Sequence, residues 1–168
     1  GISNSYSAQS YDLSGLSHHG GAMMEVGRFC VAADCDDPDI LRIVWAALTR
    51  IVEAESIQLL FGCTTLGQAG ASGYEDVFAF LYAHHRGPAH WLPGTNSTDA
   101  MRFDGVKGDS ARGRRGLSPL IKTYLVMGGW VSDHAIVDRE LNTVHVFTAL
   151  EVASVRPERA NLMRRMAG

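Results

Sequence analysis

Glu25 is the residue whose type and position most clearly indicate chemistry. It lies in a short apolar run, residues 23–26, and a carboxylate buried in such a segment needs either a partner or a task. Arg28 follows three residues later, so in a regular strand it would point to the opposite face, and a bulge at Gly27 would be needed to bring the two charges together. Two interpretations stay open: a buried ion pair that stabilises a sheet, or a catalytic pair in which Glu25 is the general base.

Cysteine and histidine side chains offer other kinds of chemistry, which the pattern does not favour. Cys30 and Cys63 could act as nucleophiles with a downstream histidine, but both lie in segments that we expect to be buried strands without an activating neighbour. The adjacent histidine pairs at 18–19 and 84–85 point apart on any helix or strand. A shared metal ion is therefore not expected, and we predict no metal site.

A parallel strand–helix–strand unit must position Glu25. Residues 22–32 alternate apolar and polar side chains and then turn apolar, which indicates a central strand. Residues 38–55 repeat apolar side chains at helical spacing behind Asp36 and Asp37, either of which can cap the helix, with Pro38 at its first position. Residues 57–64 are again short and apolar, so we predict a second buried strand, parallel to the first.

Downstream, the pattern predicts two more helices and two more strands. They are a helix over 74–85, a helix from Ser118-Pro119 to Gly128-Gly129, and strands over 130–137 and 143–152. Residues 87–116 are rich in Gly, Pro, Asn, Ser and Asp, and we predict mostly loop there. The polar tail over 156–168 is expected to fray.

Length and composition limit the class of protein. A chain of 168 residues with 46% hydrophobic content suits a single globular domain, residues 1–168. A net charge of −3, without basic residues interleaved with aromatic ones, does not suit a nucleic-acid partner. Three cysteines without metal-ligand spacing suit a reducing cytoplasm, and we expect no disulfide.

Neither a spanning segment nor a leader is visible in the sequence. No run of apolar residues is long enough to cross a bilayer, and the first residues lack a basic and then apolar signal pattern, so we expect a soluble or peripheral protein. The chain begins at Gly1 without Met, as though cut from a longer polypeptide.

Five stretches spread over roughly residues 5–150 form a combined pattern. They are Tyr6 to Ser14, Met24 to Val31, Asp37 to Leu41 with Trp45, Leu60 to Cys63, and Pro119 through Tyr124 to Val131. Together they resemble the ornithine-acyl carrier protein N-acyltransferases of ornithine-lipid synthesis. The Glu25-Val26-Gly27-Arg28 element by itself is also similar to one in the acyl-homoserine-lactone synthases, which would further need a site for an adenosyl donor that we do not find.

The resemblance implies an α/β fold of the GNAT type, a mixed sheet flanked by helices, without its first helices and strands. The strand that carries Glu25 would separate from its neighbour to admit a thioester and its pantetheine arm. Free N–H groups at Phe29, Cys30 and Val31 would then stabilise the tetrahedral oxyanion. Glu25 would take a proton from the α-ammonium of the amino acid before the amine attacks the thioester.

The donor implied is the phosphopantetheine thioester of an acyl carrier protein, used as a co-substrate, and no tightly bound cofactor is expected. The helix start at Asp37, Asp39 and Ile40 lies where acetyl-CoA-dependent relatives bind a diphosphate on free N–H groups. The carboxylates here, with Asp34 and Asp36, disfavour a diphosphate more than the single phosphodiester of a carrier protein. They could equally serve only to cap the helix.

Two further observations bear on partners. Lys107, Arg112, Arg114 and Arg115 could dock an acidic carrier protein or contact anionic lipid at a membrane surface, or could form a plain solvated loop. His145 lies where the resemblance suggests an acidic residue for the ornithine side chain, so glutamine or another neutral amino acid stays an alternative acceptor. A non-catalytic module that binds acyl carrier protein is the remaining alternative.

Overall fold

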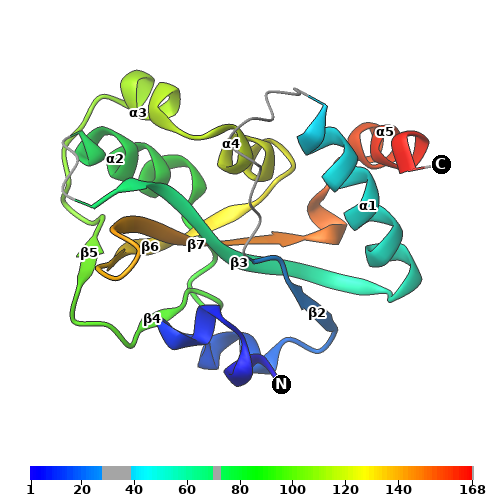
Figure 1. The fold of residues 1–168 in the computed structure, drawn as a ribbon, viewed down its shortest axis with the longest axis horizontal. Coiled ribbons are helices and arrows are strands. Elements are labelled where there is room, and N and C mark those ends of the chain that lie inside the picture. The colour runs from blue at the N-terminus through cyan, green and yellow to red at the C-terminus, as the bar shows by residue number, and fades with distance from the viewer. Residues whose placement is uncertain (28–38, 70–72, 168) are drawn as a thin grey trace.

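The computed structural model describes residues 1–27, 39–69 and 73–167 as a mixed sheet with helices on one side and an irregular N-terminal segment on the other (Figure 1). Five strands form the sheet in the order β2-β3-β7-β6-β5. Their bounds are β2 (Ala22–Glu25), β3 (Ile57–Gln68), β7 (Thr143–Glu151), β6 (Trp130–Asp138) and β5 (Ala100–Arg102). The pair β2–β3 is parallel and the other pairs are antiparallel, so the sheet is mixed.

The predicted strand–helix–strand unit is present as β2, α1 (Ile40–Ala54) and β3. Alpha-helical spacing places Trp45 of α1 in an apolar cluster with Leu60 of β3 and Leu150 of β7, which explains why the helix packs on this face. β3 runs four residues past the predicted end because its pairing with β7 continues to Gln68 and Thr143. Of the strand predicted over 22–32, the part from residue 28 on lies outside the described residues.

The helices α2 (Tyr74–His85) and α4 (Pro119–Val126) form as predicted. The Ser118 side chain accepts a hydrogen bond from the Ile121 N–H, and Pro119 occupies the first turn, where its missing N–H costs nothing. Both helices bury apolar side chains against the sheet.

Within 87–116, predicted as mostly loop, the structure adds three short elements. They are β4 (Gly94–Thr95), β5 and α3 (Ser110–Gly116). β5 gains its partner from the edge of β6, and α3 lies so close to α2 that a side chain at Gly113 would meet the Asp76 backbone carbonyl. The three elements depend on contacts with distant parts of the chain. With only two to seven residues each, they are too short to show a hydrophobic periodicity in the sequence.

The expectation that the tail frays is wrong. Residues Pro157–Ala167 form helix α5, which lies beside α1 (Figure 1). Arg164 on α5 donates to Glu53 on α1 at 2.6 Å, and Met163 packs against the apolar cluster beneath α1. These contacts with α1 stabilise the helix, and the polar composition of the segment does not predict them.

The N-terminal segment covers the face of the sheet opposite α1. It consists of three 3-10 helices, Ile2–Asn4, Ser7–Gln9 and Ser14–His18, and strand β1 (Tyr11–Asp12), which pairs with β4. Tyr11 and Leu16 are fully buried against Phe61 and Phe147 of the sheet. Among the described residues, no helix is both long and apolar enough to cross a membrane.

Candidate functional site

A cavity of about 640 Å³ opens around the middle of β3, within the size range of small-molecule sites. The described residues that line it come from both sides of the sheet: Tyr6, Gln9, Ser10, Val26, Val44, Trp45, Leu48, Cys63, Thr64, Thr65, Ser118, Leu120, Tyr124, Asp138, Glu140, Leu141, Thr143 and His145. The N-terminal segment, α1, α4 and the β6–β7 turn thus meet at one place.

The pairing of β2 with β3 explains where the cavity lies. The described register ends with Glu25 opposite Phe61, where the Val26 N–H donates to the Phe61 carbonyl at 2.7 Å. Beyond that point Cys63, Thr64 and Thr65 line the cavity, and successive strand residues face opposite sides of a sheet. The cavity therefore reaches both faces of β3. The predicted separation of β2 from its neighbour involves residues from 28 on, which lie outside the described residues.

The two faces give the cavity two different walls. On the side of α1 and α4, Val26, Trp45 and Leu120 form an apolar wall, with the Trp45 ring 5.0 Å from that of Tyr124. On the side of the N-terminal segment the wall is polar and includes Gln9, Ser10, Thr65, Asp138, Thr143 and His145. An apolar arm and a polar small molecule could thus approach each other across β3.

Glu25 lies beside this cavity and does not line it. Its Oε2 accepts a hydrogen bond from the Tyr6 N–H at 2.9 Å, and its Oε1 accepts from the Ser7 N–H at 2.7 Å and the Ser7 Oγ at 2.6 Å. Ser7 is fully buried, and the Cys63 thiol donates to its Oγ at 3.4 Å. The carboxylate is thus one hydrogen-bonded residue away from Cys63 on the cavity wall. The Glu25–Arg28 ion pair that the sequence suggested involves Arg28, which lies outside the described residues.

Cys63 is poorly suited to nucleophilic attack. Burial raises the pKa of its thiol to about 11, and the nearby Glu25 charge acts in the same direction, while the hydrogen bond with Ser7 opposes both. A thiol with such a pKa carries very little thiolate at neutral pH. This agrees with the expectation that Cys63 is not a nucleophile, while Cys30 lies outside the described residues.

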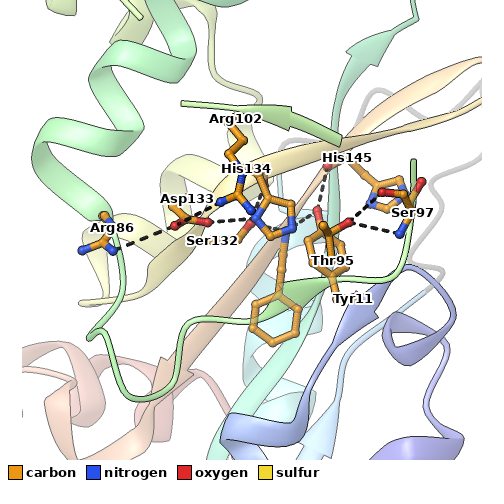
Figure 2. A network of polar contacts seen from close by, with 10 residues as sticks. Tyr11, Arg86, Thr95, Ser97, Arg102, Ser132, Asp133, His134 and His145 are labelled. Carbon is orange, nitrogen blue, oxygen red and sulfur yellow. Dashed lines mark hydrogen bonds and ion pairs between the residues drawn. The ribbon is translucent and has the colours of Figure 1, made fainter. Parts of the chain in front are cut away.

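His145 faces the cavity from β7 as a nearly buried neutral base. Its side chain is 7% exposed, its Nδ1 has no hydrogen-bond partner among the described residues, and desolvation lowers its pKa, with Asp138 acting in the opposite direction. The Tyr11 hydroxyl donates to the His145 carbonyl at 3.1 Å and accepts from the Phe147 N–H at 3.1 Å (Figure 2). The N-terminal segment thereby fixes the strand that carries His145.

A second group of polar residues continues behind that contact, on β6. Ser132 Oγ donates to the His134 carbonyl at 2.6 Å, and the buried His134 ring contacts Asp133 through its Nδ1 at 2.8 Å (Figure 2). Arg86 and Arg102 each approach the Asp133 carboxylate at 3.9 Å. None of these five side chains lines the cavity.

The other predicted site residues divide into two sets. Arg28, Phe29, Cys30, Val31 and Asp37 lie outside the described residues. Asp39 and Ile40 lie at the start of α1, where Asp39 pairs with Arg42 at 2.6 Å, and neither lines the cavity. Sequence reasoning missed Tyr6, Ser7, Asp138 and Glu140 as site residues, although Tyr6 and Ser7 belong to the first stretch of the family resemblance.

The basic cluster lies next to the cavity along the chain. Arg112 forms an ion pair with Asp76 at 2.8 Å. Arg114 and Arg115 are exposed and have no ion pair among the described residues. Helix α4 follows directly, and its N-cap Ser118 and its residue Leu120 line the cavity. Among the described residues, no group of three or more metal-ligating side chains comes together.

Comparisons with known proteins agree with this architecture. A family model described as an acetyltransferase (GNAT) domain matches residues 1–46. The chain is 31% identical over 157 residues to an L-ornithine N(alpha)-acyltransferase from Rhodobacter capsulatus, covering 92% of the chain and 60% of that relative. It is 26% identical to the enzyme of the same name from Brucella abortus and 25% identical to that from Agrobacterium fabrum.

The chain spans between about half and three fifths of the length of these curated relatives, while 89% or more of the chain itself is covered. No solved structure matches it. The fold is GNAT-like, as the family resemblance implied.

Proposed function

Because the chain is a GNAT-fold relative of the L-ornithine N(alpha)-acyltransferases, we propose that it carries the acyl-transfer site of an amino-acid N-acyltransferase. The reaction would move a fatty acyl group, such as a 3-hydroxyacyl group, onto the α-amino nitrogen of ornithine, as the first step of ornithine-lipid synthesis. The observation that carries the proposal is a cavity around β3 that has an apolar wall on one face of the sheet and a polar wall on the other.

The donor in this proposal is the phosphopantetheine thioester of an acyl carrier protein. Residues 105–130 contain five Lys and Arg and one Asp, a net charge of +4, although the whole chain has a net charge of −3. Such separation of charge favours an acidic partner beside the α4 residues that line the cavity. The apolar wall formed by α1 and α4 would accommodate the pantetheine arm. Peripheral contact with a membrane stays a prediction.

The acceptor in this proposal binds the polar wall. Its α-ammonium loses a proton, the free amine attacks the thioester carbonyl carbon, and the tetrahedral intermediate then expels the carrier thiolate, which takes up a proton. Glu25 accepts the proton of the α-ammonium through a water molecule, since neither the Glu25 carboxylate nor the Ser7 hydroxyl that donates to it lines the cavity. Strand N–H groups of Phe29 to Val31 would stabilise the oxyanion.

The test is release of the carrier thiol. The natural protein that contains this chain is mixed with 3-hydroxyacyl carrier protein, and free thiol is followed with and without ornithine. Ornithine-dependent release supports acyl transfer. Binding of the carrier without release would instead indicate a carrier-binding module, and release without ornithine would indicate a thioesterase.

A further inference from the structure

We propose that Asp138, at the end of β6, binds the side-chain ammonium of a diamino acid acceptor and so makes the site selective for ornithine over neutral amino acids. This proposal rests on the proposed function and adds the residue that determines specificity. Neither the family resemblance nor any motif points to Asp138, which the sequence shows only as the start of a turn.

Strand register places Asp138 in the polar wall of the cavity. Asp138 lies opposite Thr143, and Ile136 lies opposite His145, so Asp138, Thr143 and His145 share one face of the β6–β7 hairpin. All three line the cavity. The half-buried Asp138 carboxylate is therefore directed to the same space as the His145 ring.

The carboxylate is held in place and keeps one oxygen available. Asp138 Oδ1 accepts a hydrogen bond from the Leu141 N–H at 2.9 Å, which stabilises the turn together with Asn142, whose φ is +51°. Its Oδ2 accepts no hydrogen bond from the part of the chain that the structure describes. An ammonium could bind that oxygen without disturbing the turn.

The charges around the cavity favour a cation. Among the described residues that line it, Asp138 and Glu140 are acidic, and none is Lys or Arg. His145 does not compensate their charge, because desolvation lowers its pKa and keeps the ring neutral at physiological pH. A second ammonium on the acceptor would offset the negative charge of these carboxylates.

This arrangement removes the objection that His145 raises to ornithine as the acceptor. With His145 in the place of an acidic residue, β7 offers no carboxylate at this position to the side-chain ammonium of ornithine. Here Asp138 supplies it from the neighbouring strand, with Glu140 as a second, more exposed carboxylate in the turn.

The experiment compares two acceptors on the Asp138→Asn variant. Norvaline has the carbon skeleton of ornithine but no side-chain ammonium. We expect Asp138→Asn to lower kcat/KM for ornithine by about 10- to 100-fold, the usual effect of losing a hydrogen bond to a charged group, and to change that for norvaline less than about threefold. The asparagine keeps an oxygen for the Leu141 N–H, so the turn is retained.

Glu140→Gln should show a smaller effect of the same kind, and Glu55→Gln, on an exposed residue just after α1, should show none. Equal losses for ornithine and norvaline in Asp138→Asn, or a wild-type protein that acylates both acceptors equally well, would overturn the proposal while leaving the acyltransferase function intact. A wild-type protein that acylates no amino acid would reject both. If Asp138→Asn does not fold, Glu140→Gln carries the comparison.

Discussion

The hydroxyl group of Tyr11 donates a hydrogen bond to the carbonyl oxygen of His145, 134 residues along the chain, at 3.1 Å. The contact ties the N-terminal segment to the strand that forms the polar wall of the cavity. Because Tyr6 and Ser7 lie on the same segment and bind Glu25, one irregular stretch positions both the candidate base and the acceptor wall.

The first prediction concerns this hydrogen bond. Tyr11→Phe should lower the free energy of unfolding by about 1–2 kcal/mol, since the buried carbonyl of His145 loses its donor, while the Phe147 N–H keeps Ser132 Oγ at 3.2 Å. Urea unfolding at neutral pH measures the change. Tyr82→Phe, at a 37% exposed position, is the matched control, and an equal effect of both substitutions would contradict the assignment.

The second prediction concerns pH and His145. The unfolded chain titrates this ring near its ordinary pKa of 6.5, whereas the folded chain has a lower pKa because of desolvation. Below pH 6.5 the unfolded state therefore binds a proton that the folded state does not, and the free energy of unfolding falls as the pH falls, until the folded pKa is reached.

His145→Gln should reduce this slope, as measured by urea unfolding between pH 7 and about pH 5, the lower end of the usual range of maximal stability. His85, whose pKa is also lowered by burial, makes its own contribution to the pH dependence of the free energy of unfolding, and His85→Gln removes that contribution. The carboxylates with lowered pKa, such as Asp76 and Asp99, act only at lower pH and do not confuse the comparison. Identical slopes for wild type and His145→Gln would show that the ring is not desolvated.

The third prediction concerns Cys63. With a pKa of about 11, its thiol should react slowly with iodoacetamide at pH 8, as followed by mass spectrometry of its peptide. Cys63→Ser should keep kcat within about threefold of the wild type, because the mechanism needs no covalent enzyme intermediate. A loss of several orders of magnitude would indicate a thiol mechanism.

The fourth prediction concerns the basic segment. Replacing Arg114 and Arg115 by Glu should raise KM for the acyl carrier protein by about tenfold or more at low salt, and leave KM for ornithine unchanged. A small acyl-pantetheine thioester, which lacks the acidic protein, should be used equally well by both forms. Reduced binding to anionic vesicles without any change in carrier KM would assign the segment to membranes instead.

The fifth prediction concerns Glu25. Glu25→Gln should lower kcat by about two to four orders of magnitude while KM for the donor stays nearly constant, if Glu25 is the base. Ser7→Ala, which removes the hydroxyl that contacts Glu25 Oε1, should lower kcat in the same direction but by less, since water can take its place. Unchanged turnover with a lower free energy of unfolding for Glu25→Gln would mark the residue as structural.

Periodic elements were predictable from the sequence and contacts between distant residues were not. Helix α1 repeats apolar residues at helical spacing and strand β3 begins as a short apolar run, so the place of both followed from the pattern alone. The hydrogen bonds from Ser7 to Glu25 join a short 3-10 helix to a strand 18 residues away, and no local pattern records them. Asp138 escaped notice for the same reason, because only the strand register brings it beside His145.

The most direct measurement is the identity of the acylated product. The natural protein that contains this chain is incubated with 3-hydroxyacyl carrier protein and an equimolar pool of free amino acids, and the products are identified by mass spectrometry. We predict Nα-acyl-ornithine as the main product, with little acylation of glutamine or other neutral amino acids. N-acyl-glutamine as the main product would contradict ornithine as the acceptor, and carrier binding without any N-acylated product would contradict the acyltransferase function itself.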